Sequence, residues 1–264
     1  MGARPVVIIP ARYGSSRLPG KALAEIGGVP MVVRVYERAR VIPGIERVLV
    51  ATDDVRIADV VRAAGGEVVM TRPDHPSGTD RIAEVAARLT ADIVVNVQGD
   101  LPFLEPEMIT PMVRRLEIDP ALTMATLQTP ARTEAECDDP NVVKVVTDRE
   151  GHALYFSRQR IPAGGVSLAA GSTGSPTVMR HLGLYAYRRA FLATFTGLAP
   201  TPLERAERLE QLRALEHGYR IAVASWSGVP MVEVNTPAEL AEARHAADNP
   251  TVDGAVPPTA PVVR

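Results

Sequence analysis

Short apolar runs and longer amphipathic segments alternate over the first hundred residues, and this alternation constrains the fold more than any other feature. Residues 6–9 read Val-Val-Ile-Ile, a β-branched run typical of a buried parallel strand. Further strand-like segments lie at residues 47–52, 68–70 and 93–97, and helix-like segments lie between them at residues 29–40, 53–64 and 79–89. Because this order indicates right-handed βαβ units, we predict an α/β protein with a mostly parallel sheet flanked by helices.

The remainder of the chain predicts a smaller mixed or antiparallel sheet region. Strand-like segments occur at residues 123–128, 142–146, 153–156, 183–188, 221–225 and 231–234. The leucine spacing in residues 203–216 predicts one helix, and residues 237–247 predict a final helix. We expect a single domain over residues 1–248, followed by a disordered Pro-rich tail at residues 249–264.

Composition excludes several classes of protein. A single cysteine, Cys137, leaves no disulfide framework, and no apolar run approaches the roughly 20 residues of a membrane helix. The formal net charge of −2 argues against a dedicated nucleic-acid binder. We therefore expect a cytoplasmic protein without membrane insertion and without a nucleic-acid partner.

The basic residues are almost all arginine. Of the 29 Lys and Arg residues only Lys21 and Lys144 are lysine, which leaves 27 arginines. Codon bias in a GC-rich genome accounts for such a count. The bias also makes each remaining lysine a candidate for a position where the planar guanidinium of arginine does not serve.

A loop rich in cations, glycine and serine follows the first predicted strand. Residues 10–21 read Pro-Ala-Arg-Tyr-Gly-Ser-Ser-Arg-Leu-Pro-Gly-Lys, and they follow neither the Walker pattern nor G-x-G-x-x-G. Ligands of open α/β sheets bind beyond the carboxyl ends of strands, where Arg12, Arg17 and Lys21 would neutralise an anion. Gly14 and Ser15 would let backbone N–H groups approach it. The loop therefore predicts a triphosphate site.

This loop closely resembles the opening loop of the 3-deoxy-manno-octulosonate cytidylyltransferases. The resemblance continues in several segments over roughly residues 5–245, namely residues 50–53, 70–81, 96–100, 141–146, 153–158, 180–183 and 209–213. It implies a Rossmann-like nucleotidyltransferase sheet, CTP as a substrate and Mg²⁺ as a cofactor. It also implies a homodimer, with the interface in a sub-region at about residues 120–190.

The resemblance assigns a role to particular residues. Those implied in catalysis are Lys21, Arg12, Arg17 and Asp100. Those implied in nucleotide binding are Ala11, Arg12, Ser15, Arg17, Lys21, Thr71, Arg72, Ser77, Gly78 and Gln98. Those implied in binding the sugar-acid acceptor are Arg158, His181, Tyr185, Glu210 and Gln211.

The predicted metal site departs from the family pattern. Asp100, at the end of a strand, resembles a magnesium-binding aspartate, and the next residue is Leu101 where the family usually has glutamate. A second metal aspartate belongs to a Val-Asp-Thr-Pro turn, which reads Val-Asn-Thr-Pro here with Asn235 in the ligand position. We expect the missing negative charge at Asn235 to be replaced by Glu233, on the same strand face, or by an extra substrate oxygen. Otherwise we expect a lower affinity for the metal. Asn235 also suits the cap of the helix that follows.

The acceptor side chains suit a sugar acid. Arg158 would hold its carboxylate, and the others would pair with its hydroxyl groups. The favoured reaction is transfer of a cytidylyl group from CTP to a 3-deoxy-manno-octulosonate-type acid. A different sugar acid or a phosphonate is an alternative acceptor, and an inactive CTP-binding regulatory homologue is an alternative of another class.

Overall fold

A computed structural model describes residues 4–15, 17–164, 177–228 and 232–249. The chain divides into two compact units that interleave along the sequence. Unit 1 comprises Met1–Pro5, Ala86–Asn96 and Glu107–Ser227, and unit 2 comprises Val6–Val85, Val97–Pro106 and Gly228–Arg264. The single domain and its dimerisation sub-region stay predictions, and the predicted tail, apart from Asn249, lies outside the described residues.

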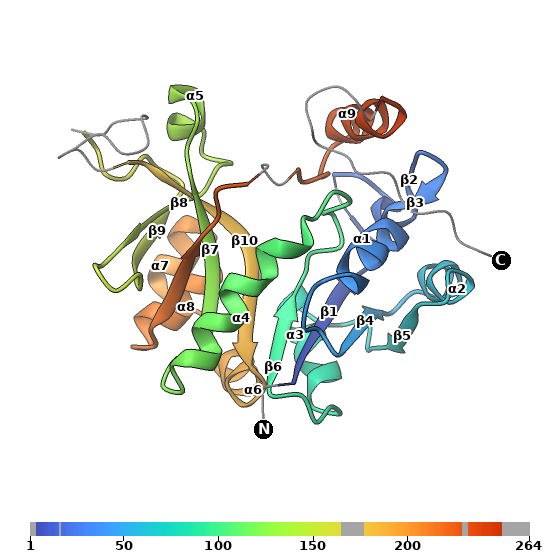
Figure 1. The fold of residues 1–264 in the computed structure, drawn as a ribbon, viewed down its shortest axis with the longest axis horizontal. Coiled ribbons are helices and arrows are strands. Elements are labelled where there is room, and N and C mark those ends of the chain that lie inside the picture. Colours follow the sequence, from blue (N-terminus) through green and yellow to red (C-terminus); the bar gives the residue numbers. More distant parts are fainter. Residues whose placement is uncertain (1–3, 16, 165–176, 229–231, 250–264) are drawn as a thin grey trace. The chain divides into compact units, whose positions relative to one another are not determined.

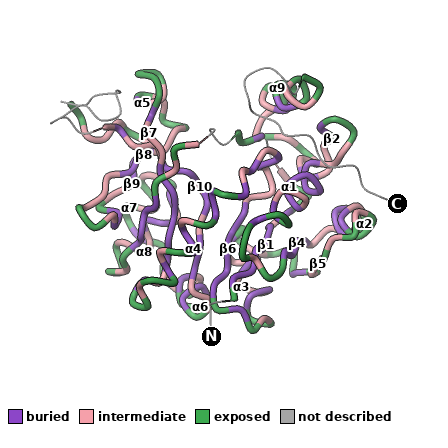
Figure 2. The backbone as a smooth tube through the Cα atoms, in the orientation of Figure 1, coloured by how far each residue is buried: buried purple, intermediate pink, exposed green. Residues whose placement is uncertain are grey.

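Unit 2 is built on a parallel sheet in the order β1–β4–β5, as the alternation of segments predicts (Figure 1). These strands are β1 (Pro5–Ala11), β4 (Arg47–Thr52) and β5 (Glu67–Met70). Almost all of β1 and β4 is buried, which explains their continuous apolar sequences (Figure 2).

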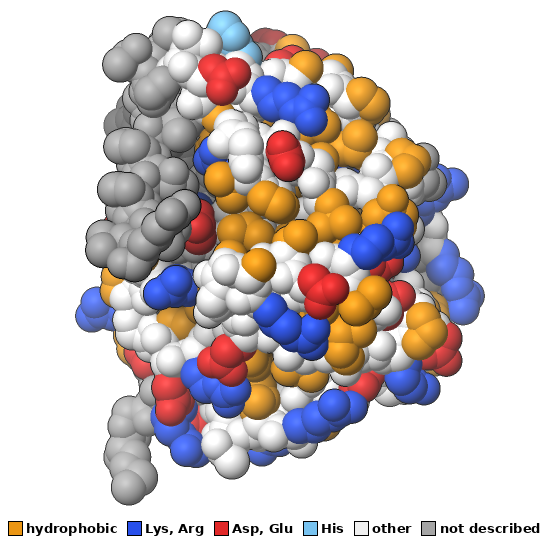
Figure 3. All heavy atoms as spheres, turned by 90° about the vertical axis from the view of Figure 1, so that its right-hand side faces the viewer, with side chains coloured by type: hydrophobic (Ala, Val, Ile, Leu, Met, Phe, Trp, Pro, Cys, Tyr) orange, Lys and Arg blue, Asp and Glu red, His pale blue; other side chains and the backbone are white. Residues whose placement is uncertain are grey.

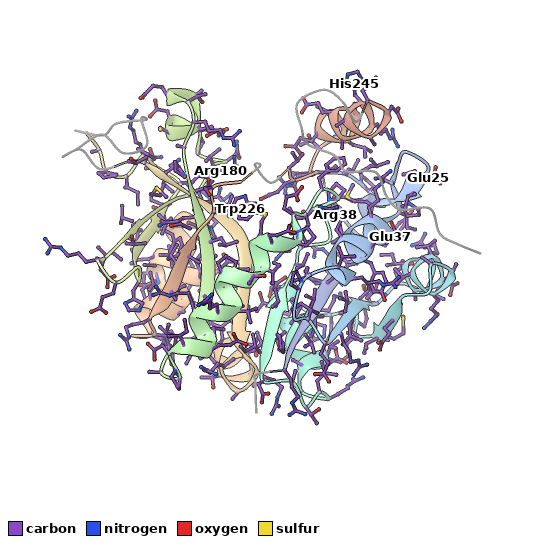
Figure 4. The ribbon with its side chains drawn as sticks, viewed as in Figure 1. Glu25, Glu37, Arg38, Arg180, Trp226 and His245 are labelled. Carbon is purple, nitrogen blue, oxygen red and sulfur yellow. The ribbon has the colours of Figure 1, made fainter. Side chains whose placement is uncertain are left out.

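Helices cover the sheet of unit 2. The elements around it are η1 (Lys21–Leu23), α1 (Met31–Arg40), α2 (Val55–Ala63), α3 (Gly78–Ala86) and α9 (Pro237–Asp248). A short hairpin of β2 (Glu25–Ile26) and β3 (Val29–Pro30) lies beside α9, and Figure 4 labels Glu25 on this hairpin and His245 on α9. A hydrophobic cluster that includes Ile26, Met31, Val234 and Leu240 joins α9 to α1. This cluster holds the chain next to Asn235.

Unit 1 contains a mixed sheet. Antiparallel β10 (Met179–Arg188) pairs with β6 (Ile93–Asn96), β7 (Met124–Pro130) and β8 (Lys144–Thr147). Strand β7 also pairs in parallel with β11 (Ile221–Ser225), and β8 forms a hairpin with β9 (Ala153–Ser157). The further helices of the described part of unit 1 are η2 (Pro106–Met108), α4 (Ile109–Ile118), α5 (Glu134–Asp138), α6 (Arg189–Gly197), α7 (Pro202–Glu207) and α8 (Gln211–Glu216).

The single helix predicted at residues 203–216 is wrong. The segment forms α7 and α8, separated by Arg208 in the left-handed conformation at φ 55°. Arg158 donates hydrogen bonds from its guanidinium to the carbonyls of Glu207 and Arg208, at 2.8 and 3.5 Å. These carbonyls bond to a side chain from another part of unit 1, so tertiary contacts override the helical periodicity.

The strand predicted at residues 231–234 is also wrong for the residues that the structure describes. Residues 232–234 form no strand, and residue 231 lies outside the description. Val234 instead donates a single backbone hydrogen bond to the carbonyl of Asp100, at 3.0 Å, and its side chain enters the core. No helix in the described part of the chain is long and apolar enough to span a membrane.

Candidate nucleotide-binding site

A pocket of about 280 Å³ lies within unit 2, at the carboxyl end of β1. The chain segments that line it are the loop after β1, the start of α3, the segment after β6 and the residue before the cap of α9. Predicted site residues that line it are Ala11, Arg12, Ser15, Arg17, Lys21, Ser77, Gly78, Gln98, Asp100 and Asn235. The fold thus brings together, in one pocket, four segments that only the family resemblance had assigned to a common site.

The loop after β1 closes on itself. The Gly20 N–H donates to the Tyr13 carbonyl at 3.2 Å, and Gly20 has φ +69°, a conformation that favours glycine. A Cβ at Gly20 would lie 3.4 Å from the Tyr13 ring. On that ring lies the guanidinium of Arg56, 3.4 Å from the centroid, and Asp54 holds Arg56 through two hydrogen bonds of 2.6 and 2.9 Å. These contacts fix the path of the chain between Arg12 and Lys21.

The segment that carries Asp100 lies close against β1. A Cβ at Gly99 would lie only 3.0 Å from the Pro10 carbonyl oxygen, so glycine permits this approach. Leu101 is buried, which shows why an apolar residue follows the aspartate. Further along, Arg38 on α1, labelled in Figure 4, donates to the carbonyl of Leu104 at 2.7 Å. Asp100 therefore stands on a segment held at both sides.

Cations and oxygen atoms meet at one end of the pocket. The Lys21 ammonium lies 2.7 Å from Asp100 Oδ2 and 3.1 Å from Asn235 Oδ1. Arg17 also donates to Asn235 Oδ1, at 3.1 Å, and the Asn235 amide donates to Glu233 Oε2 at 3.3 Å. The proposed partnership of Asn235 and Glu233 therefore exists as a side-chain contact, although no strand face carries it.

The same oxygen atoms suit a magnesium ion. Asp100 Oδ2 and Asn235 Oδ1 converge on one positive centre, the Lys21 ammonium. A carboxylate and an amide carbonyl are the hard oxygen ligands that Mg²⁺ takes, together with substrate phosphates and water. Asn235 is held by the helix start, because its N–H and that of Thr236 both donate to Glu239 Oε2 at the capping box of α9. The residues present therefore fit the metal.

The start of α3 also lines the pocket, through Ser77 and Gly78. Ser77 accepts a hydrogen bond from the Asp80 N–H at 3.1 Å, so it caps the helix. Thr71 and Arg72 are not among the described residues that line the pocket. Thr71 is buried and accepts a hydrogen bond from Arg81, and the Arg72 side chain is exposed. The structure therefore does not bring these two predicted nucleotide-binding residues to the described lining of the pocket.

Two lining residues with ionisable side chains, His75 and Arg81, carry no sequence assignment. Arg81 is buried and forms an ion pair with Asp53 at 3.1 Å, and His75 Nε2 lies 2.5 Å from Glu84 Oε2. His75 has no partner at metal-ligand spacing in the sequence, which is why sequence reasoning left it without a role. Its position after Arg72-Pro73-Asp74, inside a segment of family resemblance, is the signal that could have identified it.

The predicted acceptor residues belong to unit 1. Arg158 donates to the carbonyls of Glu207 and Pro140 at 2.8 and 2.9 Å, and its backbone N–H donates to the Glu207 carboxylate at 2.8 Å. In this state its guanidinium therefore binds backbone oxygens and holds the turn between α7 and α8. Glu210 lies at the start of α8, half-buried, and Gln211 beside it is buried.

His181 and Tyr185 lie on one face of β10, as their spacing predicts. Their ring centroids are 5.6 Å apart, and His181 also meets the edge of Phe156 at 4.9 Å. His181 Nε2 lies 2.8 Å from Thr126 Oγ1. Burial lowers the pKa of His181 to about 3, so the imidazole is neutral near pH 7 and can take part in neutral hydrogen bonds.

Lys144 has a structural environment. Its buried ammonium donates to the carbonyls of Asp139, Val142 and Arg158, at 2.8, 2.7 and 2.6 Å. Burial lowers the pKa of Lys144 from its ordinary value. Three carbonyls around one compact ammonium explain a lysine in a chain that otherwise uses arginine.

On the molecular face drawn in Figure 3, the basic and acidic side chains are interspersed.

Comparison with known proteins identifies relatives over nearly the whole chain. Residues 6–221 match the family model described as "Cytidylyltransferase". The chain is 56% identical over 236 residues to the 3-deoxy-manno-octulosonate cytidylyltransferase of Syntrophotalea carbinolica, covering 88% of this chain and 94% of the relative. It is 53% identical to the protein of the same name from Geobacter metallireducens, covering 88% and 93%.

A solved structure shares the fold. It is a CMP:2-keto-3-deoxy-manno-octonic acid synthetase complexed with CTP, 42% identical, with a TM-score of 0.86 over 94% of this chain and all of that one. The match confirms the predicted fold class, a mostly parallel sheet flanked by helices with a smaller antiparallel region.

Proposed function

Because this chain belongs to the 3-deoxy-manno-octulosonate cytidylyltransferase family, we propose that it transfers the cytidylyl group of CTP to a 3-deoxy-manno-octulosonate-type sugar acid. The products are the CMP-sugar and pyrophosphate. The observation that carries this function is the cluster of Lys21, Arg17, Asp100 and Asn235 in a pocket at the end of β1. Cations and metal-ligating oxygens at one place are what a nucleoside triphosphate requires.

The loop after β1 binds the triphosphate. Arg12, Arg17 and Lys21 supply positive charge, and the fixed loop path holds that charge in place before CTP enters. Preorganised charge stabilises a transition state without the cost of reorganisation. In the free protein the Lys21 ammonium pairs with the Asp100 carboxylate. When the substrates bind, the carboxylate would pair with the metal ion and the ammonium would pair with the phosphates.

Asp100 and Asn235 would hold Mg²⁺ through their side-chain oxygens. When bound, the ion would offset charge on the triphosphate and on the leaving pyrophosphate. Glu233 contacts Asn235 and adds a negative charge that a neutral asparagine lacks. Arg17 keeps the asparagine carbonyl oriented through its hydrogen bond.

The chemical step needs no covalent enzyme intermediate. The anomeric 2-hydroxyl oxygen of the sugar acid forms a bond to the α-phosphorus, the bond to the pyrophosphate oxygen breaks, and the hydroxyl proton passes to solvent. Most of the rate enhancement comes from orientation of two anions, which supplies roughly 7–11 kcal/mol in well-oriented reactions. Arg158, His181, Tyr185, Glu210 and Gln211 are proposed to orient the acceptor.

Pyrophosphate release from CTP and 3-deoxy-manno-octulosonate tests the proposal directly. We expect turnover that requires both substrates and Mg²⁺. A panel of other sugar acids and phosphonates separates the alternative acceptors, since the true acceptor has the highest kcat/KM. Tight CTP binding without turnover on any acceptor would indicate the regulatory homologue instead.

The cellular setting belongs to the same proposal. We propose a cytoplasmic homodimer that supplies an activated sugar acid for lipopolysaccharide biosynthesis. Light scattering coupled to size-exclusion chromatography measures the dimer, and fractionation of the native host measures the compartment.

A further inference from the structure

The ring of His75 is a feature of the pocket that the proposed chemistry does not use. His75 is the one aromatic side chain among the described residues that line the pocket, and its side chain is only 4% exposed. Its Nε2 lies 2.5 Å from the Glu84 carboxylate on α3. Glu84 also accepts a hydrogen bond from the Arg72 N–H at 3.1 Å. The carboxylate therefore ties both the ring and the chain of residues 72–75 to the helix.

This contact selects the tautomer of the ring. A carboxylate accepts hydrogen bonds, so His75 Nε2 carries the hydrogen that is donated to Glu84. In a neutral imidazole the other nitrogen, Nδ1, is then an acceptor. Among the described residues, the one hydrogen bond of this ring is the one to Glu84. In the neutral form Nδ1 is therefore the ring atom left to accept a further hydrogen bond, and His75 lines the pocket.

We propose that His75 determines base specificity by accepting a hydrogen bond from the exocyclic amino group of cytosine, and that Glu84 is its positioning residue. Cytosine presents an N4 amino donor where uracil presents an O4 acceptor. A fixed acceptor at Nδ1 therefore favours CTP over UTP. The location fits, because His75 lines the pocket together with Ser77 and Gly78, just before and at the start of α3.

This inference rests on the proposed function, because it assumes that the pocket binds a nucleotide with the base towards α3. A site built to pair with a polar group rejects a ligand that lacks it, because a buried polar atom is then left unsatisfied. The energy of such a mismatch predicts a discrimination of roughly tenfold or more. The measured quantity is the ratio of kcat/KM for CTP to kcat/KM for UTP.

Two substitutions at position 75 separate the two ring nitrogens. His75→Asn places an amide oxygen near the position of Nδ1, whereas His75→Gln reaches the position of Nε2 and leaves no acceptor at Nδ1. We expect His75→Gln to lower the CTP-to-UTP ratio at least tenfold and His75→Asn to keep it within about threefold of the native value. Glu84→Gln is expected to lower the ratio as well, since an amide can donate to Nε2 and reverse the tautomer. Asp59→Asn, on the exposed side of α2, removes a helix carboxylate away from the pocket and is the control.

The ratio is internal to each variant, so a partial loss of folded protein cancels. A CTP-to-UTP ratio that stays at the native value in both His75→Gln and Glu84→Gln would overturn the proposal. If kcat/KM falls equally for the two substrates, the residues have a purely structural role. Equilibrium binding of CTP and UTP to the same variants gives the ratio without turnover. A native protein that binds CTP but does not turn it over contradicts the proposed function alone.

Discussion

Lys21 Nζ lies 2.7 Å from Asp100 Oδ2, although the two residues are 79 positions apart in the sequence. The contact joins the loop after β1 to the segment after β6, and the same ammonium reaches Asn235 Oδ1 at 3.1 Å. A single compact charge therefore organises three segments of the pocket. On binding, the triphosphate would compete with Asp100 for the Lys21 ammonium, and Mg²⁺ would compete with Lys21 for the oxygens of Asp100 and Asn235.

Substitution of Lys21 by arginine tests whether shape or charge matters here. We expect Lys21→Arg to lose about 100-fold in kcat, because a planar guanidinium cannot take the position of a compact ammonium between two oxygens. Pyrophosphate release measures the loss, and thermal unfolding checks that the protein remains folded. Near-normal turnover in the arginine variant would show that charge alone suffices.

The Asn235 position tests the metal site. Asn235→Asp replaces the amide that contacts Glu233 with a carboxylate, so two negative charges would lie about as close as the 3.3 Å now observed. Such a site attracts a divalent cation more strongly. We expect half-maximal activity at a lower Mg²⁺ concentration, and tighter Mn²⁺ binding measured by electron paramagnetic resonance.

Glu233→Gln gives the complementary measurement. If Glu233 compensates for the neutral asparagine, this variant requires more Mg²⁺ than the native protein. An unchanged Mg²⁺ requirement in both Asn235→Asp and Glu233→Gln would remove positions 233 and 235 from the metal site.

The second lysine predicts a stability effect. Lys144→Arg places a larger planar group among three carbonyls that a buried ammonium now satisfies. We expect a loss of about 2–3 kcal/mol in the free energy of unfolding, because buried hydrogen bonds to a charged group are lost. Urea unfolding measures it, with Arg149→Lys in the exposed β8–β9 turn as control. Equal midpoints for Lys144→Arg and the control would contradict the structural role.

His181 predicts a pH dependence of stability. Burial lowers the pKa of His181 to about 3 in the folded protein, below the ordinary value of 6.5. Between these values the unfolded chain binds more protons, so stability falls as the pH falls from about 6.5 towards 3. The slope from this residue is at most about 1.4 kcal/mol per pH unit. We expect His181→Asn to lose less stability than the native protein between pH 6.5 and 4.5. Urea unfolding at each pH measures the free energy of unfolding of both proteins. Parallel plots of this free energy against pH would contradict the lowered pKa of His181.

The local sequence pattern was enough to predict much of the fold and the polar residues at one end of the pocket. The β-branched runs that became β1 and β4 are buried on both faces, so their sequences carry a strong signal. The loop after β1 carries its cations and glycines within twelve residues. Residues 203–216 show the limit, because their leucine spacing continues through Arg208 while the guanidinium of Arg158 binds the carbonyls at the break.

The sequence by itself determined the family, the chemistry of the loop at residues 10–21 and the scarcity of lysine, because each of these is written in local residue types. Only the tertiary structure decided what the two lysines do. Lys21 meets a carboxylate and an amide oxygen from distant segments, and Lys144 meets three buried carbonyls. It also brought His75 against Glu84 in the pocket wall. Partners of this kind are set by the folding of the chain, since a side chain carries its donors in the sequence but acquires its acceptors only in space.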